Sequence, residues 1–283
     1  MFAVLEAGDW KDAEAIAESL EGWIFRGHSN ADWALETTLF RGASDFGYRD
    51  SLTHAENWML REFKRRAHHF VANPPPEDDK LEWLALIQHF GGPTRLLDFS
   101  HSFYVAAFFA MERGEKEAAI WAIHEDELAR SVADETGADI KMENVVEVNR
   151  RHIALVLNSD QSKPIVVNME PERMNERLSI QQGLFLLPGD LRVPFMSVLE
   201  KTFKFPPGGL ADRAPIKWES EMANRVPLES NIVKIVLPRS MHSEALDDLH
   251  QMNMNSATLF PGLDGFARSL YFRLRTSEIE AEF

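Results

Sequence analysis

Three short segments of the chain combine residue types that could bind or convert a ligand, and the first is built around an arginine. Arg26 follows the apolar run Trp-Ile-Phe and directly precedes Gly27. A guanidinium binds phosphate, carboxylate or amide groups well, and glycine allows the backbone to approach such a ligand closely. A surface Arg26 that pairs with an acidic neighbour is the structural alternative. The candidate binding residues of this segment are Phe25, Arg26, Gly27, His28 and Ser29.

The second segment places Thr94, Arg95, Asp98 and Ser100 around a leucine-rich run. Within a strand, side chains three positions apart point to opposite faces, so Arg95 and Asp98 are not expected to pair with each other. One of the two charges must then point inward or toward a pocket, and an unpaired buried ion is costly. That charge needs either a ligand or a structural ion-pair partner, and the sequence leaves both open.

The third segment offers neutral amides, because Gln181 and Gln182 directly precede the apolar run 183–187. An amide can donate and accept hydrogen bonds without the cost of burying a charge, which suits it to ligand binding. The same side chains could instead satisfy the backbone of a neighbouring loop.

Common metal and nucleotide motifs are absent from the sequence. The ten histidines form no HExxH pattern, there is no cysteine, and no GxGxxG, GxxxxGK[ST] or GxSxG motif occurs. We therefore expect no metal site, no dinucleotide-binding βαβ unit and no P-loop.

Short strands and amphipathic helices must position the three clusters. We predict strands over 23–27, 94–99 and 183–187, with Ser100 or Ser102 capping a helix after the second strand. Strands and helices do not alternate regularly, so the expected fold class is α+β in a single domain. Residues 139–160 are ambiguous. Further strands are predicted at 118–124, 164–168 and 232–237, and helices at 9–20, 51–70, 77–90, 125–136, 194–205, 240–251 and from 264.

Composition restricts the partners and the location of the protein. The formal net charge is -15, which opposes non-specific binding to nucleic acid, although a local basic patch keeps a nucleic-acid partner open. No apolar run reaches the length of a membrane span, so no membrane partner is expected. The absence of cysteine and of a signal peptide favours a cytoplasmic location. The patch consists of Arg61, Lys64, Arg65 and Arg66.

Four segments, in this order, resemble the FRG domain family, which is named for a Phe-Arg-Gly motif. They are WIFRGHSNADWALETTLFR (23–41), WLALIQHFGGPTRLLDFSHSFYVAAFFA (83–110), NERLSIQQGLFLLP (175–188) and TLFPGLDGFARSL (258–270). The motif-bearing region thus spans about 23–272 of one FRG-type domain, 1–283. The resemblance implies a bacterial or phage-associated intracellular protein, sometimes a toxin or a defence protein.

The same three clusters are more distantly similar to ADP-ribosyltransferase-like proteins. Phe25 to Ser29 looks like their first-strand motif, and Leu97 to Ser102 like their Ser-Thr-Ser motif. The resemblance implies two small, split β-sheets flanked by helices, with NAD bound as substrate in the cleft between them. Arg26 would then contact the nicotinamide ribose, and Asp98, Gln181 and Gln182 would complete the catalytic set. The further cofactor-binding residues would be Thr94, Arg95, Ser100, Ser102, Phe103 and Tyr104.

The chain departs from this pattern at one position that matters for chemistry. Gln181 and Gln182 occupy the place of the catalytic glutamate, and a neutral amide supplies no charge against a developing cation. Glu172 and Glu176, just upstream, could substitute for that glutamate, or Asp98 could be the working carboxylate instead. Three functions therefore stay open: an ADP-ribosyltransferase or NAD glycohydrolase with a protein or nucleic-acid acceptor, a non-catalytic nucleotide- or nucleic-acid-sensing module, and a hydrolase or nuclease. The last would use Arg26, Arg95, Asp98 and His89. The sequence does not indicate the oligomeric state.

Overall fold

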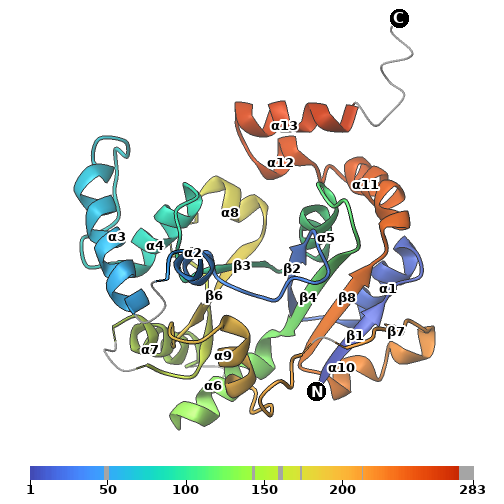
Figure 1. Cartoon of the computed structure of the whole chain (residues 1–283), viewed down its shortest axis with the longest axis horizontal. Coiled ribbons are helices and arrows are strands. Elements are labelled where there is room, and N and C mark those ends of the chain that lie inside the picture. Colours follow the sequence, from blue (N-terminus) through green and yellow to red (C-terminus); the bar gives the residue numbers. More distant parts are fainter. Residues whose placement is uncertain (48–50, 142–143, 159–161, 173, 212, 274–283) are drawn as a thin grey trace, which may run out of the picture.

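The computed structural model of the chain describes residues 1–47, 51–141, 144–158, 162–172, 174–211 and 213–273. Its described residues form one eight-stranded mixed sheet with the strand order β5-β6-β3-β2-β4-β8-β1-β7 (Figure 1). β1 runs parallel to its neighbours β8 and β7, and the other neighbouring strands are antiparallel. The predicted α+β class is confirmed. The strands are β1 (Phe2–Glu6), β2 (Trp23–His28), β3 (Leu97–Ser100), β4 (Ala118–His124), β5 (Val166–Met169), β6 (Gly183–Pro188), β7 (Ile216–Lys217) and β8 (Ile232–Leu237).

The sheet is nearly divided in its middle, between β2 and β3. Their ladder consists of one residue pair, Phe25 opposite Ser100, whereas β2 pairs with β4 over six residues. Both strands lie wholly within the described residues. The two small sheets expected from the resemblance are therefore joined into one sheet, and the junction between its halves is the single pair.

Helices cover both faces of the sheet and one of its ends. They are α1 (Trp10–Ser19), α2 (Thr38–Phe46), α3 (Leu52–Ala67), α4 (Lys80–His89), α5 (Phe103–Met111), α6 (Glu125–Thr136), α7 (Val145–Asn158), α8 (Glu176–Ile180), α9 (Phe195–Thr202), α10 (Val226–Glu229), α11 (His242–Gln251), α12 (Ser256–Leu259) and α13 (Leu263–Arg273). No helix of the described residues is long and apolar enough to cross a membrane.

The alternation of side chains along the strands divides the core into layers. On β4, Ala118, Ile120 and Ala122 pack with α1, α5 and α11, while Trp121 and Ile123 pack on the other face with α9. A third cluster joins α3, α4 and α7 to the outer side of β5 and β6, at the left of Figure 1. α4 and β3 therefore stand on one side of the sheet's division, and β2 and α5 on the other.

Several elements differ from their predicted bounds. The strand predicted over 94–99 begins at Leu97, because Thr94 uses both its backbone groups and its hydroxyl in contacts with α2 and α4. The ambiguous region 139–160 contains α7, and its residues 142–143 and 159–160 lie outside the described ones. β1, α2 and α8 were not predicted. The five-residue α8 is too short to show a helical period, yet it carries part of the candidate site.

Candidate functional site

The Phe-Arg-Gly segment on β2 sends its three residues to three different environments. Phe25 is buried and meets Phe103 edge to face, with ring centroids 5.9 Å apart. Gly27 lies against the backbone of α5, where a Cβ would stand 1.9 Å from the Ala106 carbonyl oxygen. Only glycine allows this approach, so β2 and α5 pack without a gap. Arg26, between these two fixed neighbours, is held at the division of the sheet.

Arg26 bridges the separated strands with its guanidinium. Its Nη1 donates to the backbone oxygen of Asp98 over 2.6 Å and lies 3.6 Å from the Asp98 Oδ2 atom. Its Nε donates to His28 Nε2 over 3.2 Å. The Arg26 side chain is 19% exposed, and burial lowers its pKa against the opposing effect of the Asp98 carboxylate. Among the described residues, the Nη2 group has no protein partner and remains available to a ligand.

His28 holds Arg26 in place as a neutral ring. Because Arg26 Nε donates to Nε2, the ring proton must be on Nδ1, which is 3.2 Å from the Trp33 carbonyl oxygen that accepts it. Burial, and after it the Arg26 charge, lowers the pKa of His28 to about 3. The imidazole is thus uncharged at neutral pH, and both of its nitrogens are used inside the protein.

On the other side of the division, Gln88 and Thr94 orient Asp98. The Thr94 hydroxyl accepts from the Leu96 amide and donates to Gln88 Oε1 over 2.6 Å. This fixes the Gln88 amide so that its Nε2 donates to Asp98 Oδ2 over 2.9 Å. The Asp98 carboxylate is 53% exposed. A polar chain therefore connects α4, β3 and β2, and it ends in a carboxylate that is accessible to a ligand.

Asp98 lines a polar pocket of about 90 Å³. The pocket lies between the end of α4, β3 and α8, so it brings together segments that are far apart in the sequence. Burial, and after it the nearby Arg177 charge, lowers the pKa of His89, which keeps this lining residue neutral at neutral pH. The lining residues are Ala85, Gln88, His89, Asp98, Asn175, Arg177, Leu178, Gln181 and Phe185.

The two predicted glutamines meet this pocket in different ways. Gln181 lines it, but its Nε2 donates to the Leu259 carbonyl oxygen of α12 over 2.8 Å. Gln182 is exposed, with φ at 47°, in the left-handed region that its place in the turn between α8 and β6 requires. The carbonyl oxygen of Gln182 accepts from the His101 amide. Both residues thus use some of their hydrogen-bonding groups for contacts within the fold.

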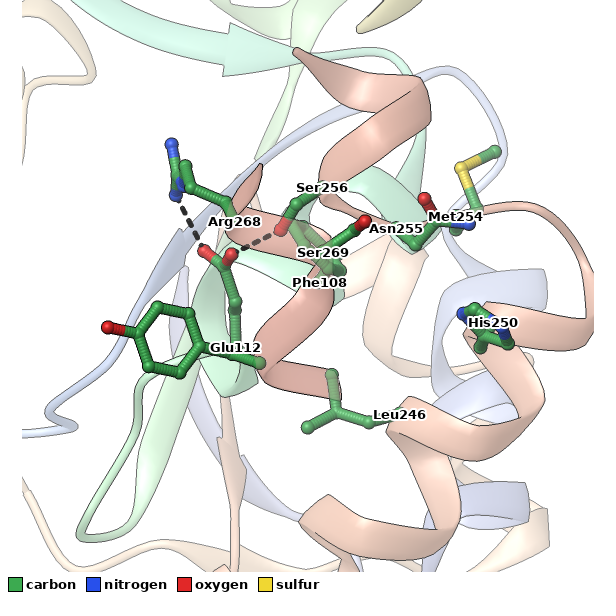
Figure 2. Close-up of a pocket in the computed structure, with 10 residues that line it drawn as sticks. Phe108, Glu112, Leu246, His250, Met254, Asn255, Ser256, Arg268 and Ser269 are labelled. Atoms are coloured by element: carbon green, nitrogen blue, oxygen red, sulfur yellow. Dashed lines mark hydrogen bonds and ion pairs between the residues drawn. The ribbon is translucent and has the colours of Figure 1, made fainter. Parts of the chain in front are cut away.

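The C-terminal helices form one wall beside the pocket. Figure 2 shows how α12 and α13 are anchored to the residue after α5: Glu112 accepts from Ser256 Oγ over 2.5 Å and from Arg268 Nη2 over 2.9 Å. Phe260 lies between two guanidinium groups, at 4.4 Å from Arg177 and 4.0 Å from Arg268. The contacts of Glu112 with α12 and α13, and of Arg177 with Phe260, therefore hold Leu259 and Phe260 in place beside the pocket.

Several predicted residues serve other contacts. Arg95 is 4% exposed and pairs with Glu56 of α3. It lines a separate cavity, so Arg95 and His89 do not form the joint site that a hydrolase or nuclease would need. The predicted separation of Arg95 from Asp98 is confirmed.

The serine and aromatic residues predicted for the site also make contacts within the fold. Ser100 Oγ donates to the Gln181 carbonyl oxygen, and Ser102 Oγ accepts from the Val105 amide as the N-cap of α5. Phe103 is buried against Trp10, and the Tyr104 hydroxyl donates to Glu14. Neither ring lines the pocket, so the cofactor-binding role that the resemblance implies for Phe103 and Tyr104 has no support in this arrangement.

The basic patch on α3 is largely occupied by partners within the protein. Arg65 and Arg66 both pair with Glu62, while Lys64 lies near Glu77 and over the Trp83 ring. The described residues also contain no group of three or more acidic or histidine side chains that could hold a metal ion. The polar pocket at the sheet division is thus the candidate site.

Sequence reasoning missed two residues that contribute to this site. Gln88 was hidden inside a helix that was predicted only for its apolar face, and no local pattern indicates that its amide reaches Asp98 ten residues later. Arg177 lies four residues before Gln181, the first glutamine of the third candidate segment. That spacing on a recognised helix would have placed both side chains on one face, but α8 was not predicted.

Comparison with known proteins supports the first resemblance and is silent on the second. No curated protein and no solved structure matches the chain significantly. The model of the FRG domain matches residues 21–119. This range covers β2, α4, β3 and α5, and thus Arg26, Gln88 and Asp98, but it ends before Arg177 and Gln181. Residues 21–119 are therefore similar to the FRG domain, and this matched segment supplies one half of the pocket.

Proposed function

We propose that the pocket binds the nicotinamide ribose end of NAD and that the protein transfers the ADP-ribose group to water or to an acceptor. The observation that carries the proposal is that Asp98 and Gln181 line one pocket while Arg26, on the neighbouring strand, reaches Asp98 where β2 and β3 separate. A bound ribose would lie against a carboxylate that can stabilise positive charge, beside an amide and a guanidinium that can bind its oxygens.

The chemical step breaks the bond between C1′ of the ribose and the nicotinamide nitrogen. The electron pair of that bond goes to the nitrogen, which loses its positive charge as nicotinamide leaves. An oxygen of water or of an acceptor hydroxyl then bonds to C1′, and its proton passes to solvent. Positive charge develops on the ribose between these events, so a negatively charged group beside C1′ lowers the barrier.

Asp98 is the group that we assign to this role. One of its oxygens accepts from Gln88, the other has no hydrogen-bond partner among the described residues, and the side chain is half exposed. Arg26 would hold the ribose or the amide of nicotinamide through its free Nη2. His28 would act as a positioning residue, because its neutral ring fixes the Arg26 Nε.

The pocket accommodates only one end of a dinucleotide. Its volume of about 90 Å³ is below the roughly 300 to 1,000 Å³ of sites that enclose a whole small molecule. The adenosine half of NAD would therefore extend over the surface. We expect modest affinity for NAD, since a partly enclosed ligand buries less of its surface.

The test measures nicotinamide released from NAD by the full chain and by Asp98→Asn. We expect release by the unmodified protein and a rate about a hundredfold to a thousandfold lower in the variant, because the loss of one electrostatic contact to the transition state has effects of this size. Asp247→Asn is the matched control, since Asp247 is exposed on α11 and outside the pocket. Equal rates for Asp98→Asn and the unmodified protein would remove Asp98 from the mechanism.

A second candidate function is a nucleotide-binding module without turnover. The observation that favours it is that the two glutamines are neutral and that the Gln181 amide is tied to Leu259. Calorimetric binding of NAD or ADP-ribose without any nicotinamide release would support this reading over the enzymatic one. An absence of both binding and release would contradict both candidates.

The biological setting that fits an NAD-consuming activity is a bacterial toxin or a phage-defence effector, with a protein or nucleic acid as possible acceptor of ADP-ribose. NAD loss in cells that express the protein, but not in cells that express Asp98→Asn, is the expected result. Cells whose NAD stays constant while growth is unaffected would contradict this setting.

A further inference from the structure

Arg177 lines the pocket, and its guanidinium has no hydrogen-bonded partner among the described residues. It lines the cavity beside Asn175 and Gln181. Among the residues that the structure describes, its guanidinium has one close contact, the face of the Phe260 ring at 4.4 Å, and no hydrogen bond or ion pair. All five of its N–H donors are thus open to a ligand.

The two guanidinium groups at the pocket, Arg26 and Arg177, outnumber the one carboxylate among its described lining residues, Asp98. The Asp98 carboxylate is already close to Arg26, at 3.6 Å, and accepts from Gln88. His89 is neutral, as shown above. After burial, the Asp98 carboxylate has the largest effect on the pKa of Arg177, and Arg268 and Asp264 act on it with opposite signs. Arg177 therefore shares the lining carboxylate, Asp98, with Arg26, in a chain whose net charge is -15.

The guanidinium is also packed against an aromatic ring before any ligand arrives. Arg177 lies over the Phe260 ring at 4.4 Å, and Arg268 lies over the same ring at 4.0 Å. Arg268 is itself fixed by Glu112, as Figure 2 shows. A planar fork that is already oriented loses little conformational entropy when it binds two oxygens of an anion.

We propose that Arg177 forms a phosphate subsite of the pocket and that the ligand is a nucleotide bound through its 5′-phosphate or pyrophosphate. The inference deepens the proposed function and rests on it for the identity of the nucleotide. In a nucleotide whose ribose lies beside Asp98, the phosphate is attached through the oxygen on C5′. Arg177 lines the same cavity, and its guanidinium can donate hydrogen bonds to that phosphate.

A pair of ligands that differ by one phosphate tests the subsite. Binding of nicotinamide mononucleotide and of nicotinamide riboside is measured by calorimetry for the full chain, Arg177→Ala and Arg177→Lys. We expect Arg177→Ala to weaken the mononucleotide by about tenfold to a hundredfold, as for a lost charge-assisted hydrogen bond, and to leave the riboside within about twofold. Arg177→Lys should recover part of the loss, since it restores the charge without the fork.

Arg239→Ala is the control for net charge, because Arg239 is exposed and lies outside the pocket. It removes the same charge and should leave both affinities unchanged. Equal weakening of both ligands by Arg177→Ala, or equal weakening of the mononucleotide by Arg239→Ala, would overturn the subsite.

Binding of ADP separates this inference from the proposed function. If ADP binds and depends on Arg177 while NAD is neither bound nor consumed, the phosphate subsite stands and the proposed function fails. If NAD is consumed at the same rate and the same KM by Arg177→Ala, the proposed function stands and the subsite fails. An unmodified protein that binds none of these phosphate-bearing probes contradicts the subsite directly.

Discussion

Two arginine–carboxylate pairs in this protein use the same chemical groups for different purposes. Arg95 and Glu56 are 4% and 1% exposed, with two hydrogen bonds between them, and Lys80 lies 3.1 Å from the same carboxylate. Arg26 and Asp98 are 19% and 53% exposed, and their charged atoms are 3.6 Å apart. The first pair is closed to solvent, whereas the second leaves donors and an acceptor open.

The difference indicates which charged groups remain able to interact with a ligand. At Glu56, every strong interaction is satisfied inside the protein, so a ligand would gain nothing that water and protein do not already provide. At Asp98, neutral partners, Gln88 and His28, orient the two charged groups without neutralising them. We read the closed pair as structural and the open pair as functional, and the following predictions can break that division.

The largest expected effect is on the closed pair. Glu56→Gln leaves the buried Arg95 and the partly buried Lys80 without their shared counter-charge, and the free energy of unfolding should fall by about 3 to 5 kcal/mol. Urea denaturation followed by circular dichroism measures the loss. Glu62→Gln, on the same helix α3 but between two exposed arginines, should cause a much smaller loss. Similar losses in the two variants would show that the closed pair is not a structural centre.

The next effect concerns the packing that fixes the open pair. Gly27→Ala places a Cβ 1.9 Å from the Ala106 carbonyl oxygen, so β2 and α5 must separate. We expect a loss of about 3 kcal/mol of stability, at the upper end of the range for overpacked sites, together with loss of NAD turnover. Gly42→Ala is the control, because its Cβ meets no atom within 4 Å and the site lies within α2. There, alanine should be neutral or slightly stabilising.

The sequence identified both arginines, Arg26 and Arg95, as candidate site residues but did not distinguish their roles. Each lies near glycine and a predicted strand, and nothing in the local sequence separates a structural arginine from a functional one. The partner of Arg95 is Glu56, 39 residues earlier, and the Gln181 amide is held by Leu259, 78 residues later. Segments such as α3 and β8 were predicted because the apolar residues of α3 recur with a helical period and β8 is a short apolar run that is buried on both faces. Side-chain partners depend on how these segments meet, which one sequence does not show.

A pH dependence of stability should arise from His28. In the unfolded chain this histidine takes up a proton near its ordinary pKa, about 6.5, but in the folded protein the pKa is about 3. Between these values the unfolded state binds one more proton, so stability falls as the pH is lowered from 6.5, by about 1.4 kcal/mol per pH unit from this group. Above pH 6.5 its contribution is complete.

His28→Gln isolates this contribution from other acid-sensitive groups. Burial also lowers the pKa of His152. Burial by itself would raise the pKa of Glu56, but the charges and hydrogen bonds of Arg95 and Lys80 together bring it below its ordinary value. Both groups therefore act in the same direction. Glutamine can accept from Arg26 and donate to the Trp33 carbonyl but does not titrate. Urea unfolding at pH 7.5, 6.5, 5.5 and 4.5 should show a shallower pH slope for the variant than for the unmodified protein, and parallel slopes would contradict the neutral, buried histidine.

The smallest expected effect on stability belongs to Asp98, the residue with the largest expected effect on activity. Its carboxylate is half exposed and 3.6 Å from Arg26, so Asp98→Asn should change the free energy of unfolding by about 1 kcal/mol or less, as for other exposed pairs. Asparagine can still accept from Gln88, which preserves the local geometry. Urea denaturation beside the nicotinamide assay gives both quantities for one variant. A loss as large as that of Glu56→Gln would mean that Asp98 maintains the fold, and the division between closed and open pairs would then fail at the open one.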